Sequence, residues 1–218
     1  MFIVNGVHQI DGIKGAQAYL ITGARPFLVD TGLPGQAQAI LDYLGRVGIS
    51  PHDLTAIVIT HYDVDHIGSA AALQKLTGCV VYASEVEIPY LQQKVPRPGI
   101  KRWLPLLTAP WYGRLQPLYD IVPLVDGDSL EGWECILTPG HTPGHLVLYR
   151  DGIVVAGDLL QGGTIRLAPS FLTWDSTLVR RSVRALLKRP WQWILPGHGS
   201  VTKASTHWLD NIQKVLSN

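Results

Sequence analysis

The sequence has few of the residues that mark several large classes of protein. Its 218 residues include only two cysteines, Cys79 and Cys135, which lie far apart in apolar, strand-like runs. Such surroundings favour free buried thiols over a structural disulfide. Charged residues make up 16% of the chain and the formal net charge is +1. This balance gives no electrostatic argument for nucleic-acid binding, which usually needs a basic face.

Long hydrophobic segments are also missing. No stretch approaches the ~18 apolar residues of a membrane helix. The start of the chain, "MFIVNGVHQIDG", lacks the basic and apolar regions of a signal peptide. We therefore expect a cytoplasmic protein that binds neither membrane nor nucleic acid. A hydrophobic fraction of 46% is enough for one well-packed domain over residues 1–218.

Glycine and proline divide the chain into short apolar runs that predict the secondary structure. We expect helices over residues 36–48, 65–78, 175–190 and 204–218, the third with Asp175 or Ser176 as its N-cap. We expect strands over residues 2–10, 16–23, 26–32, 54–60, 79–84, 133–140, 145–150, 153–158 and 191–199. Two similar halves, each a sheet with helices outside, predict an α/β (α+β) fold built as a four-layer αβ/βα sandwich.

Residues 85–120 differ from the rest of the chain. They contain six of the fifteen prolines, five aromatic residues, five Lys/Arg and three acidic residues. Because this composition is too irregular for a central layer, we expect an inserted helical or loop lid. Its aromatic side chains Trp103, Trp111 and Tyr112 are candidates for contact with a partly apolar substrate. Lys101, Arg102 and Arg114 either contact an anionic tail of that substrate or form a solvated basic surface.

Candidate metal ligands follow the ends of apolar strands. They are His61 after "AIVIT", His141 after "CILTPG", Asp158 after "IVVAG" and His198 after "WILPG", and Asp30 in "FLVDTG" has a similar place. Functional sites collect at such strand ends in α/β sheets. A lone histidine after a strand is more often a turn or core residue, but the joint pattern favours a metal site.

The segment "THYDVDHIG" contains four potential ligands within six positions: His61, Asp63, Asp65 and His66. Imidazole and carboxylate groups bind borderline and hard divalent metals. In an extended turn, alternate side chains point the same way, so one short segment can serve two metals. His145 is better placed to hold a ligand or a substrate by a hydrogen bond than to bind metal. His8, His52 and His207 are expected at the surface or in packing.

The motifs "THYDVDH", "TPGHTPGH", "VVAGD" and "LPGHG", in this order and spacing, resemble those of the metallo-β-lactamase superfamily. They span residues 60–199, and "FLVDTG" extends the match to residue 27. The resemblance implies the αββα sandwich. It also implies two divalent metal ions, and zinc is the metal that the family resemblance favours.

The resemblance also implies a role for each candidate ligand. The first metal takes His61, Asp63 and His141, and the second takes Asp65, His66 and His198. Asp158 bridges the two metals, and Asp30 is a structural residue behind the site.

Asp63 departs from the family pattern, which has a second histidine at this position. A carboxylate adds a negative charge and a harder oxygen ligand. We therefore expect a shift of preference from zinc toward iron or manganese. A degenerate site that holds one metal or none is the alternative interpretation.

Two neighbouring metals can generate a hydroxide that attacks a carbonyl carbon at neutral pH. The sequence has no G-x-S-x-G motif and no cysteine with a histidine near it in sequence, so no other nucleophile is evident. We expect hydrolysis of an ester, thioester or lactone, with Asp65 handling protons. Two roles for Tyr62 are equally open, either donating a hydrogen bond to a developing oxyanion or packing alone.

Other functions stay open at this stage. Within the family, a phosphodiesterase or a β-lactamase-like amidase is the alternative reaction. A non-catalytic module that binds a metabolite, or that pairs with a partner through the aromatic lid, is the alternative class. A small molecule is the expected partner, and the sequence leaves open whether the protein is a homodimer.

Overall fold

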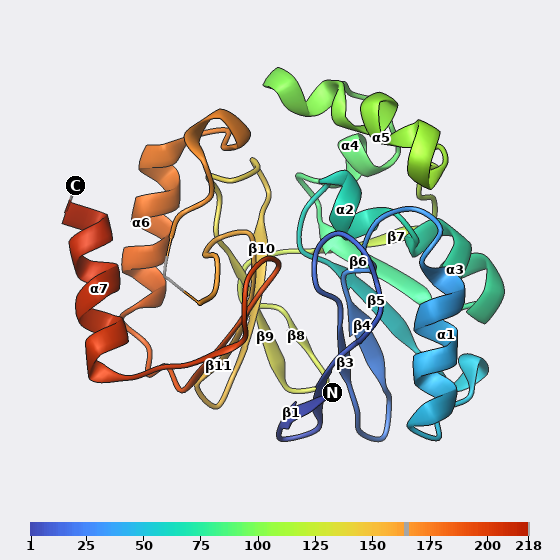
Figure 1. Cartoon of the computed structure of the whole chain (residues 1–218), viewed down its shortest axis with the longest axis horizontal. Coiled ribbons are helices and arrows are strands. Elements are labelled where there is room, and N and C mark those ends of the chain that lie inside the picture. The colour runs from blue at the N-terminus through green and yellow to red at the C-terminus, as the bar shows by residue number, and fades with distance from the viewer. Residues whose placement is uncertain (164–165, 218) are drawn as a thin grey trace. The chain divides into compact units, whose positions relative to one another are not determined.

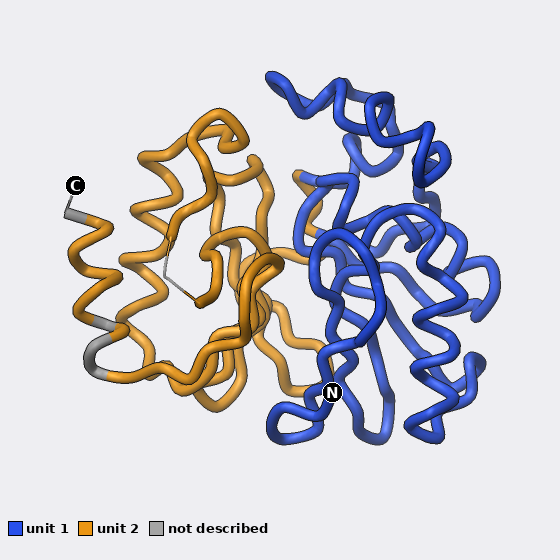
Figure 2. Tube along the Cα trace, in the orientation of Figure 1, with its two compact units in different colours: residues 1–83, 87–123 blue, residues 84–86, 124–218 orange. Residues whose placement is uncertain are grey.

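The computed structural model describes residues 1–163 and 166–217 and divides into two compact units (Figures 1 and 2). Unit 1 comprises residues 1–83 and 87–123, and unit 2 comprises residues 84–86 and 124–218. Each unit has one β-sheet with helices beside it, which confirms the expected mixed α/β class (Figure 1). The single domain expected over residues 1–218 stays a prediction.

The sheet of unit 1 follows the chain order. Its strands in the described residues are β1 (Phe2–Val4), β2 (Val7–Gln9), β3 (Tyr19–Ile21), β4 (Phe27–Val29), β5 (Ala56–Ile59), β6 (Val80–Ser84) and β7 (Ile121–Leu124). β4, β5 and β6 are parallel neighbours, whereas β1 to β4 are antiparallel. The carboxyl ends of β4 and β5 therefore meet at one edge of the sheet.

The single strand expected over residues 2–10 is wrong, because β1 and β2 form a hairpin. Asn5 and Gly6 connect them with φ angles of 44° and 74°. Positive φ at both central residues is the conformation of a two-residue hairpin turn, and Asn-Gly is its preferred sequence. The turn signal thus outweighed the apolar run that surrounds it.

Helices cover the sheet of unit 1 and extend beyond it. They are α1 (Ala37–Arg46), α2 (Val64–Ile67), α3 (Ala70–Thr77), α4 (Ile88–Leu91) and α5 (Leu104–Tyr112), with short 3-10 turns η1 (Pro51–Asp53) and η2 (Gly99–Arg102). α1 and α3 lie beside the sheet (Figure 1). Leu20, Leu28 and Ile57 from the strands pack in one core with Ile40 and Leu73 from these helices.

The single helix expected over residues 65–78 is also wrong, because α2 and α3 are separate. A Cβ atom at Gly68 would collide with the backbone of Leu33 and Pro34. The next residue, Ser69, donates its backbone N–H to Thr31 Oγ1 at 3.3 Å, and its hydroxyl donates to the Leu33 carbonyl at 2.8 Å. These tertiary contacts stop the helical ladder between the two helices.

Unit 2 contains the second sheet, in the order β13-β12-β11-β10-β9-β8. Its strands are β8 (Ser129–Leu130), β9 (Trp133–Leu137), β10 (Leu146–Arg150), β11 (Ile153–Gly157), β12 (Trp193–Pro196) and β13 (Thr202–Lys203). β11 and β12 are parallel, and β9, β10 and β11 alternate in direction. The carboxyl ends of β9, β11 and β12 consequently lie at one edge.

The described residues of unit 2 also form the helices α6 (Ser176–Leu186) and α7 (Thr206–Ser217) and the 3-10 turn η3 (Ser170–Leu172). Asp175 is the N-cap of α6, since its carboxylate accepts from the backbone N–H groups of Thr177 and Leu178 at 2.8 and 3.0 Å. The apolar face of the helices packs on the strands through Val154, Val183 and Ile212.

Residues 88–119, which we call the basic segment, contain five Lys/Arg and no Asp or Glu. The segment is attached to the core of unit 1 by the buried side chains of Leu91, Leu115 and Leu118. α5, in contrast, buries none of its residues. In the part of the chain that the structure describes, no helix is both long enough and apolar enough to cross a membrane.

The two cysteine thiols are free and buried, as their apolar surroundings favour. Burial raises the pKa of Cys79, and burial followed by the nearby Asp128 raises the pKa of Cys135 to about 12. Both thiols are therefore protonated near neutral pH and are poor nucleophiles.

Candidate metal centre

The centre of unit 1 begins where β4 and β5 end side by side. β4 ends at Val29 and β5 ends at Ile59, so the residues that directly follow these parallel strands, Asp30 and Thr60, meet at the same edge of the sheet. Thr60 donates its backbone N–H to Asp30 Oδ1 at 2.9 Å and its hydroxyl to Asp30 Oδ2 at 2.8 Å. Asp30 has a φ of 59°, a conformation that aspartate tolerates better than most residues.

These bonds fix the proton positions on two imidazoles. His66 Nδ1 lies 2.7 Å from Asp30 Oδ2, and because a carboxylate only accepts, Nδ1 carries the proton. His61 Nδ1 lies 2.9 Å from Thr60 Oγ1. The Thr60 hydroxyl already donates to Asp30, so it accepts from His61 Nδ1. Both histidines therefore present the lone pair of Nε2, which is the arrangement that a metal ligand requires.

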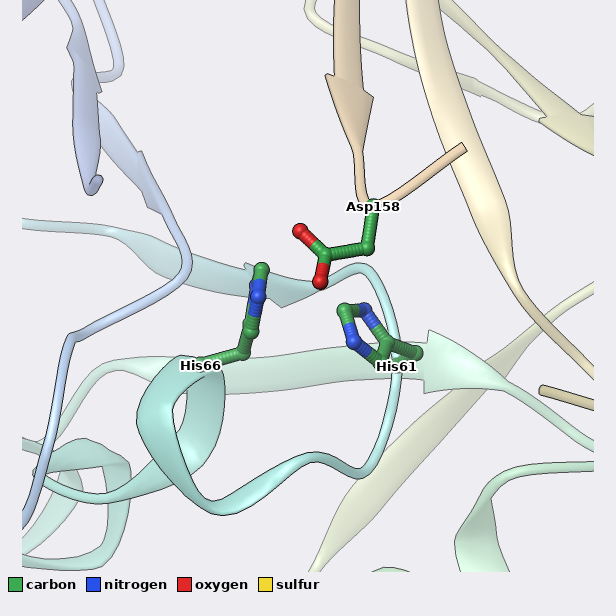
Figure 3. Close-up of side chains that lie close together, drawn as sticks. All are labelled: His61, His66 and Asp158. Carbon is green, nitrogen blue, oxygen red and sulfur yellow. The ribbon is translucent and has the colours of Figure 1, made fainter. Parts of the chain in front are cut away.

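The two rings lie side by side on the turn between β5 and α2, with centroids 4.0 Å apart (Figure 3). Both histidines are fully buried. His61 Nε2 is 3.4 Å from Asp63 Oδ2, and the ligand atoms of Asp65 and His66 lie within 4.8 Å of each other. Unit 1 thus brings together all four ligands expected from "THYDVDHIG".

Asp63 has a partner that sequence reasoning missed. Lys101 Nζ lies 2.6 Å from Asp63 Oδ2, and the lysine and aspartate are only 4% and 7% exposed. The ammonium group compensates the charge that aspartate adds relative to histidine. Lys101 comes from η2, 38 residues away in sequence, so no local spacing pointed to it.

Tyr62 points into the core of unit 1 and its environment is cationic and aromatic. Its ring is fully buried, 4.8 Å from the Tyr90 ring, with Arg97 and Lys101 5.7 and 5.5 Å from its centroid. The Tyr62 backbone N–H donates to Glu87 Oε2 at 2.8 Å. Burial, followed by Asp63 and Glu87, raises the pKa of the Tyr62 hydroxyl. This setting supports the packing interpretation, and a catalytic role for Tyr62 stays a prediction.

Unit 2 places its three candidate ligands on the loops after β9, β11 and β12. Asp158 directly follows β11 (Figure 3). His141 Nε2 and His198 Nε2 lie 3.6 and 3.5 Å from the same atom, Asp158 Oδ2. The parallel pairing of Gly157 with Pro196 and a bond from the Gly197 N–H to the Gly157 carbonyl (2.7 Å) hold these loops together.

His145 lies behind Asp158 and holds its backbone. The Asp158 N–H donates to His145 Nε2 at 3.1 Å, so Nε2 is the acceptor and the proton is on Nδ1. His145 Nδ1 in turn lies 2.8 Å from Thr138 Oγ1. With both nitrogens in hydrogen bonds, His145 is suited to position Asp158 and not to bind metal.

The donor set fits divalent metal ions. The N···O distances of 3.4 to 3.6 Å among these ligands are too long for good hydrogen bonds. Two ligand atoms that each lie ~2.0–2.2 Å from a tetrahedral metal are about 3.3–3.6 Å apart. Imidazole nitrogens with fixed tautomers and carboxylate oxygens are the ligands of zinc, iron and manganese in proteins.

The aromatic residues expected to contact substrate occupy different environments. Trp103 and Trp111 are exposed, at 55% and 77%. Tyr112 is half-buried against the core of unit 1, with Lys14 Nζ 5.8 Å from its ring centroid. Their role in binding substrate stays a prediction.

Residues 12–198 match the family model described as the metallo-beta-lactamase superfamily. Among curated proteins, the chain is 30% identical over 199 residues to a protein described as "Probable metallo-hydrolase YflN" from Bacillus subtilis, covering 79% of this chain and 74% of the relative. It is 26% identical to the hydroxyacylglutathione hydrolase GloC of Haemophilus influenzae, covering 80% of each chain.

Among solved structures, the chain resembles TTHA1623 in a di-iron-bound form. The TM-score is 0.69 at 28% sequence identity, and the match covers 86% of this chain and 89% of that one. Together with the two sheets and their helices, these matches confirm the fold class expected from the sequence.

Proposed function

The chain belongs to the metallo-β-lactamase superfamily of metallo-hydrolases, and from this premise we propose that it hydrolyses an ester, thioester or lactone of a small molecule. The observation that carries the proposal is the hydrogen-bond chain from Asp30 through Thr60 to His61, with its branch to His66. It fixes two imidazole lone pairs in a buried turn, which is the arrangement that metal ligands require.

We further propose that the ligands of the two units serve one pair of metal ions. His61, Asp63 and His141 would hold the first ion, Asp65, His66 and His198 the second, and Asp158 both. Bound divalent ions supply Lewis acidity and lower the pKa of water for attack on a carbonyl carbon. Asp65, which is half-buried beside His66, is placed to accept a proton. The di-iron form of TTHA1623 and the carboxylate of Asp63 support iron or manganese beside zinc.

The choice of a carbonyl substrate rests on the relatives and on the protein's charge. The hydroxyacylglutathione hydrolase similarity favours thioesters among carbonyl substrates, at the limited identity of 26%. The net charge of +1 gives no support for a nucleic-acid substrate. A small molecule is therefore the proposed partner.

The test is a hydrolysis panel on metal-defined protein. Thioesters, lactones, aryl esters and phosphodiesters would be offered after loading with Zn²⁺, Mn²⁺ or Fe²⁺, with metal content measured by elemental mass spectrometry. We expect two equivalents of metal and turnover of at least one carbonyl substrate. Well under one equivalent and no turnover would instead identify a binding module.

The role of Asp158 is tested by Asp158→Ala. We expect loss of two-metal occupancy and a loss of activity of at least about 10³-fold, because the bridging carboxylate is removed. The matched control is Asp151→Ala, which removes an exposed aspartate from the turn at the other end of β11. Full metal content in Asp158→Ala would reject the bridging role.

A further inference from the structure

Unit 1 has a cavity of about 480 Å³ within the basic segment. This volume is in the range of small-molecule sites, ~300–1,000 Å³. None of the candidate metal ligands lines the cavity. Its lining consists of Gln93, Val95, Pro96, Arg97, Arg102, Pro105, Leu106, Ala109, Arg114 and Leu115.

The side chains that line the cavity carry only one sign of charge, which is positive. They include three arginines and no acidic residue. The whole basic segment has five Lys/Arg and no Asp or Glu, whereas the remaining chain has thirteen Lys/Arg and seventeen Asp/Glu. A cavity with one sign of charge and apolar walls concentrates its field and attracts anions.

Arg97 is the buried member of the three, with 8% of its surface exposed. Its Nε donates to the Tyr62 carbonyl at 3.1 Å, but its buried Nη2 has no hydrogen-bond partner among the described residues. A buried donor without a partner costs free energy, and an anion could supply the missing acceptor. Arg102 and Arg114 are exposed and form no ion pair within the described part of the chain.

Apart from Gln93, the remaining wall is apolar, and part of it is exposed to solvent. Leu106 is 66% exposed and Val95 is 41% exposed, although both line the cavity. Pro96, Pro105 and Leu115 add further apolar surface. An alkyl chain laid against these side chains would remove apolar area from water on both partners.

We propose that this cavity binds an amphiphilic anion, with a carboxylate or phosphate group on the arginines and an alkyl chain on the apolar wall. The site goes beyond the proposed hydrolysis and needs no metal ion. Two independent features carry it: a one-sign cluster of arginines and an apolar wall in the same cavity.

Calorimetric titration of the full chain tests the proposal with four probes at concentrations below micelle formation. Decanoate and decyl phosphate offer both features, decanol lacks the charge, and inorganic phosphate lacks the chain. We expect saturable one-to-one binding of a decyl anion, at least about tenfold tighter than of decanol or phosphate. The stronger of the two anions identifies the head group. Equal binding of decanol, or no binding of either anion, would overturn the proposal.

Two variants locate the site. Arg102→Gln/Arg114→Gln should weaken binding of the decyl anion at least about tenfold, because it removes two of the three cations that would contact the head group. Leu106→Asp should weaken it as well. The matched control is Lys94→Gln, an exposed cation of the same segment that does not line the cavity, with an expected change below twofold.

Equal losses in the control and the double variant would show a diffuse charge effect and reject the cavity. The last experiment measures binding of the protein to anionic vesicles. Capture by vesicles without binding of the monomeric anions would assign the basic segment to a membrane surface instead. Circular dichroism of each variant checks that it is folded.

Discussion

The ligand turn at residues 60–68 and the basic segment at residues 88–119 belong to the same unit but are built in opposite ways. In the turn, His61, Asp63 and His66 are buried and held by short polar contacts. In the segment, Trp111 and Leu106 face solvent and cations have no acidic neighbours in sequence. Buried polar groups must be satisfied by specific partners, whereas exposed apolar and basic side chains gain most from a ligand.

The largest effect expected from this comparison concerns Asp30, which carries the ligand turn. Asp30→Ala should lower the free energy of unfolding by about 3–5 kcal/mol, because Thr60 and His66 lose their buried acceptor. Metal content should fall with it, since the imidazoles lose their orientation. Urea denaturation and elemental analysis measure the two effects.

Asp120→Ala is the matched control for Asp30→Ala. Asp120 also has a positive φ, 53°, but it is exposed. Its replacement repeats the backbone strain without breaking buried bonds, so a loss below about 1 kcal/mol is expected. A similar loss in both variants would mean that the backbone conformation, and not the hydrogen-bond chain, makes Asp30 important.

The next effect concerns the pair Lys101–Asp63, which joins the two regions. Lys101→Met should lower the free energy of unfolding of the metal-free protein by about 3 kcal/mol, because it removes the cation that compensates a buried carboxylate. The same change should raise the affinity of the first metal site, since a cation no longer shares Asp63 Oδ2 with the incoming ion. Calorimetric titration with Mn²⁺ and Zn²⁺ measures the affinity. Equal affinities in Lys101→Met and the unmodified protein would show that Lys101 does not influence metal binding.

Lys101 also changes how Asp63→His should be tested. From the sequence, this substitution alone is expected to raise zinc occupancy relative to manganese or iron. In the structure, this substitution would remove the carboxylate that contacts Lys101 Nζ and place an imidazole beside the buried ammonium group. The informative variant is therefore Asp63→His/Lys101→Met, for which we expect the zinc preference without the loss of stability. No change in metal selectivity would show that Asp63 is neutral in metal choice.

The sequence predicted those parts of the molecule that are encoded locally. Most of the short strands and the N-cap at Asp175 follow from short-range patterns, and they are present in the structure. The break at Gly68 and the partner of Asp63 could not be predicted from local patterns, because they depend on Pro34 and on Lys101, which come from other parts of the chain. The roles of the individual ligands stay predictions that the metal measurements test.

The smallest effect is expected for Tyr62→Phe, and it separates the two interpretations of that residue by magnitude. The Tyr62 hydroxyl is buried with no hydrogen-bond partner among the described residues, so its removal should leave stability unchanged or raise it by up to about 1 kcal/mol. Turnover should stay within twofold. If Tyr62 donated to a developing oxyanion, its replacement would instead lower turnover by about 10²–10³-fold.

Tyr19→Phe is the control for Tyr62→Phe. The Tyr19 hydroxyl donates to Gln17 at 2.7 Å, and the loss of this bond should lower the free energy of unfolding by about 1 kcal/mol. Since burial raises the pKa of Tyr62, the hydroxyl stays protonated at working pH, and any pH dependence of turnover should be the same in Tyr62→Phe and the natural chain.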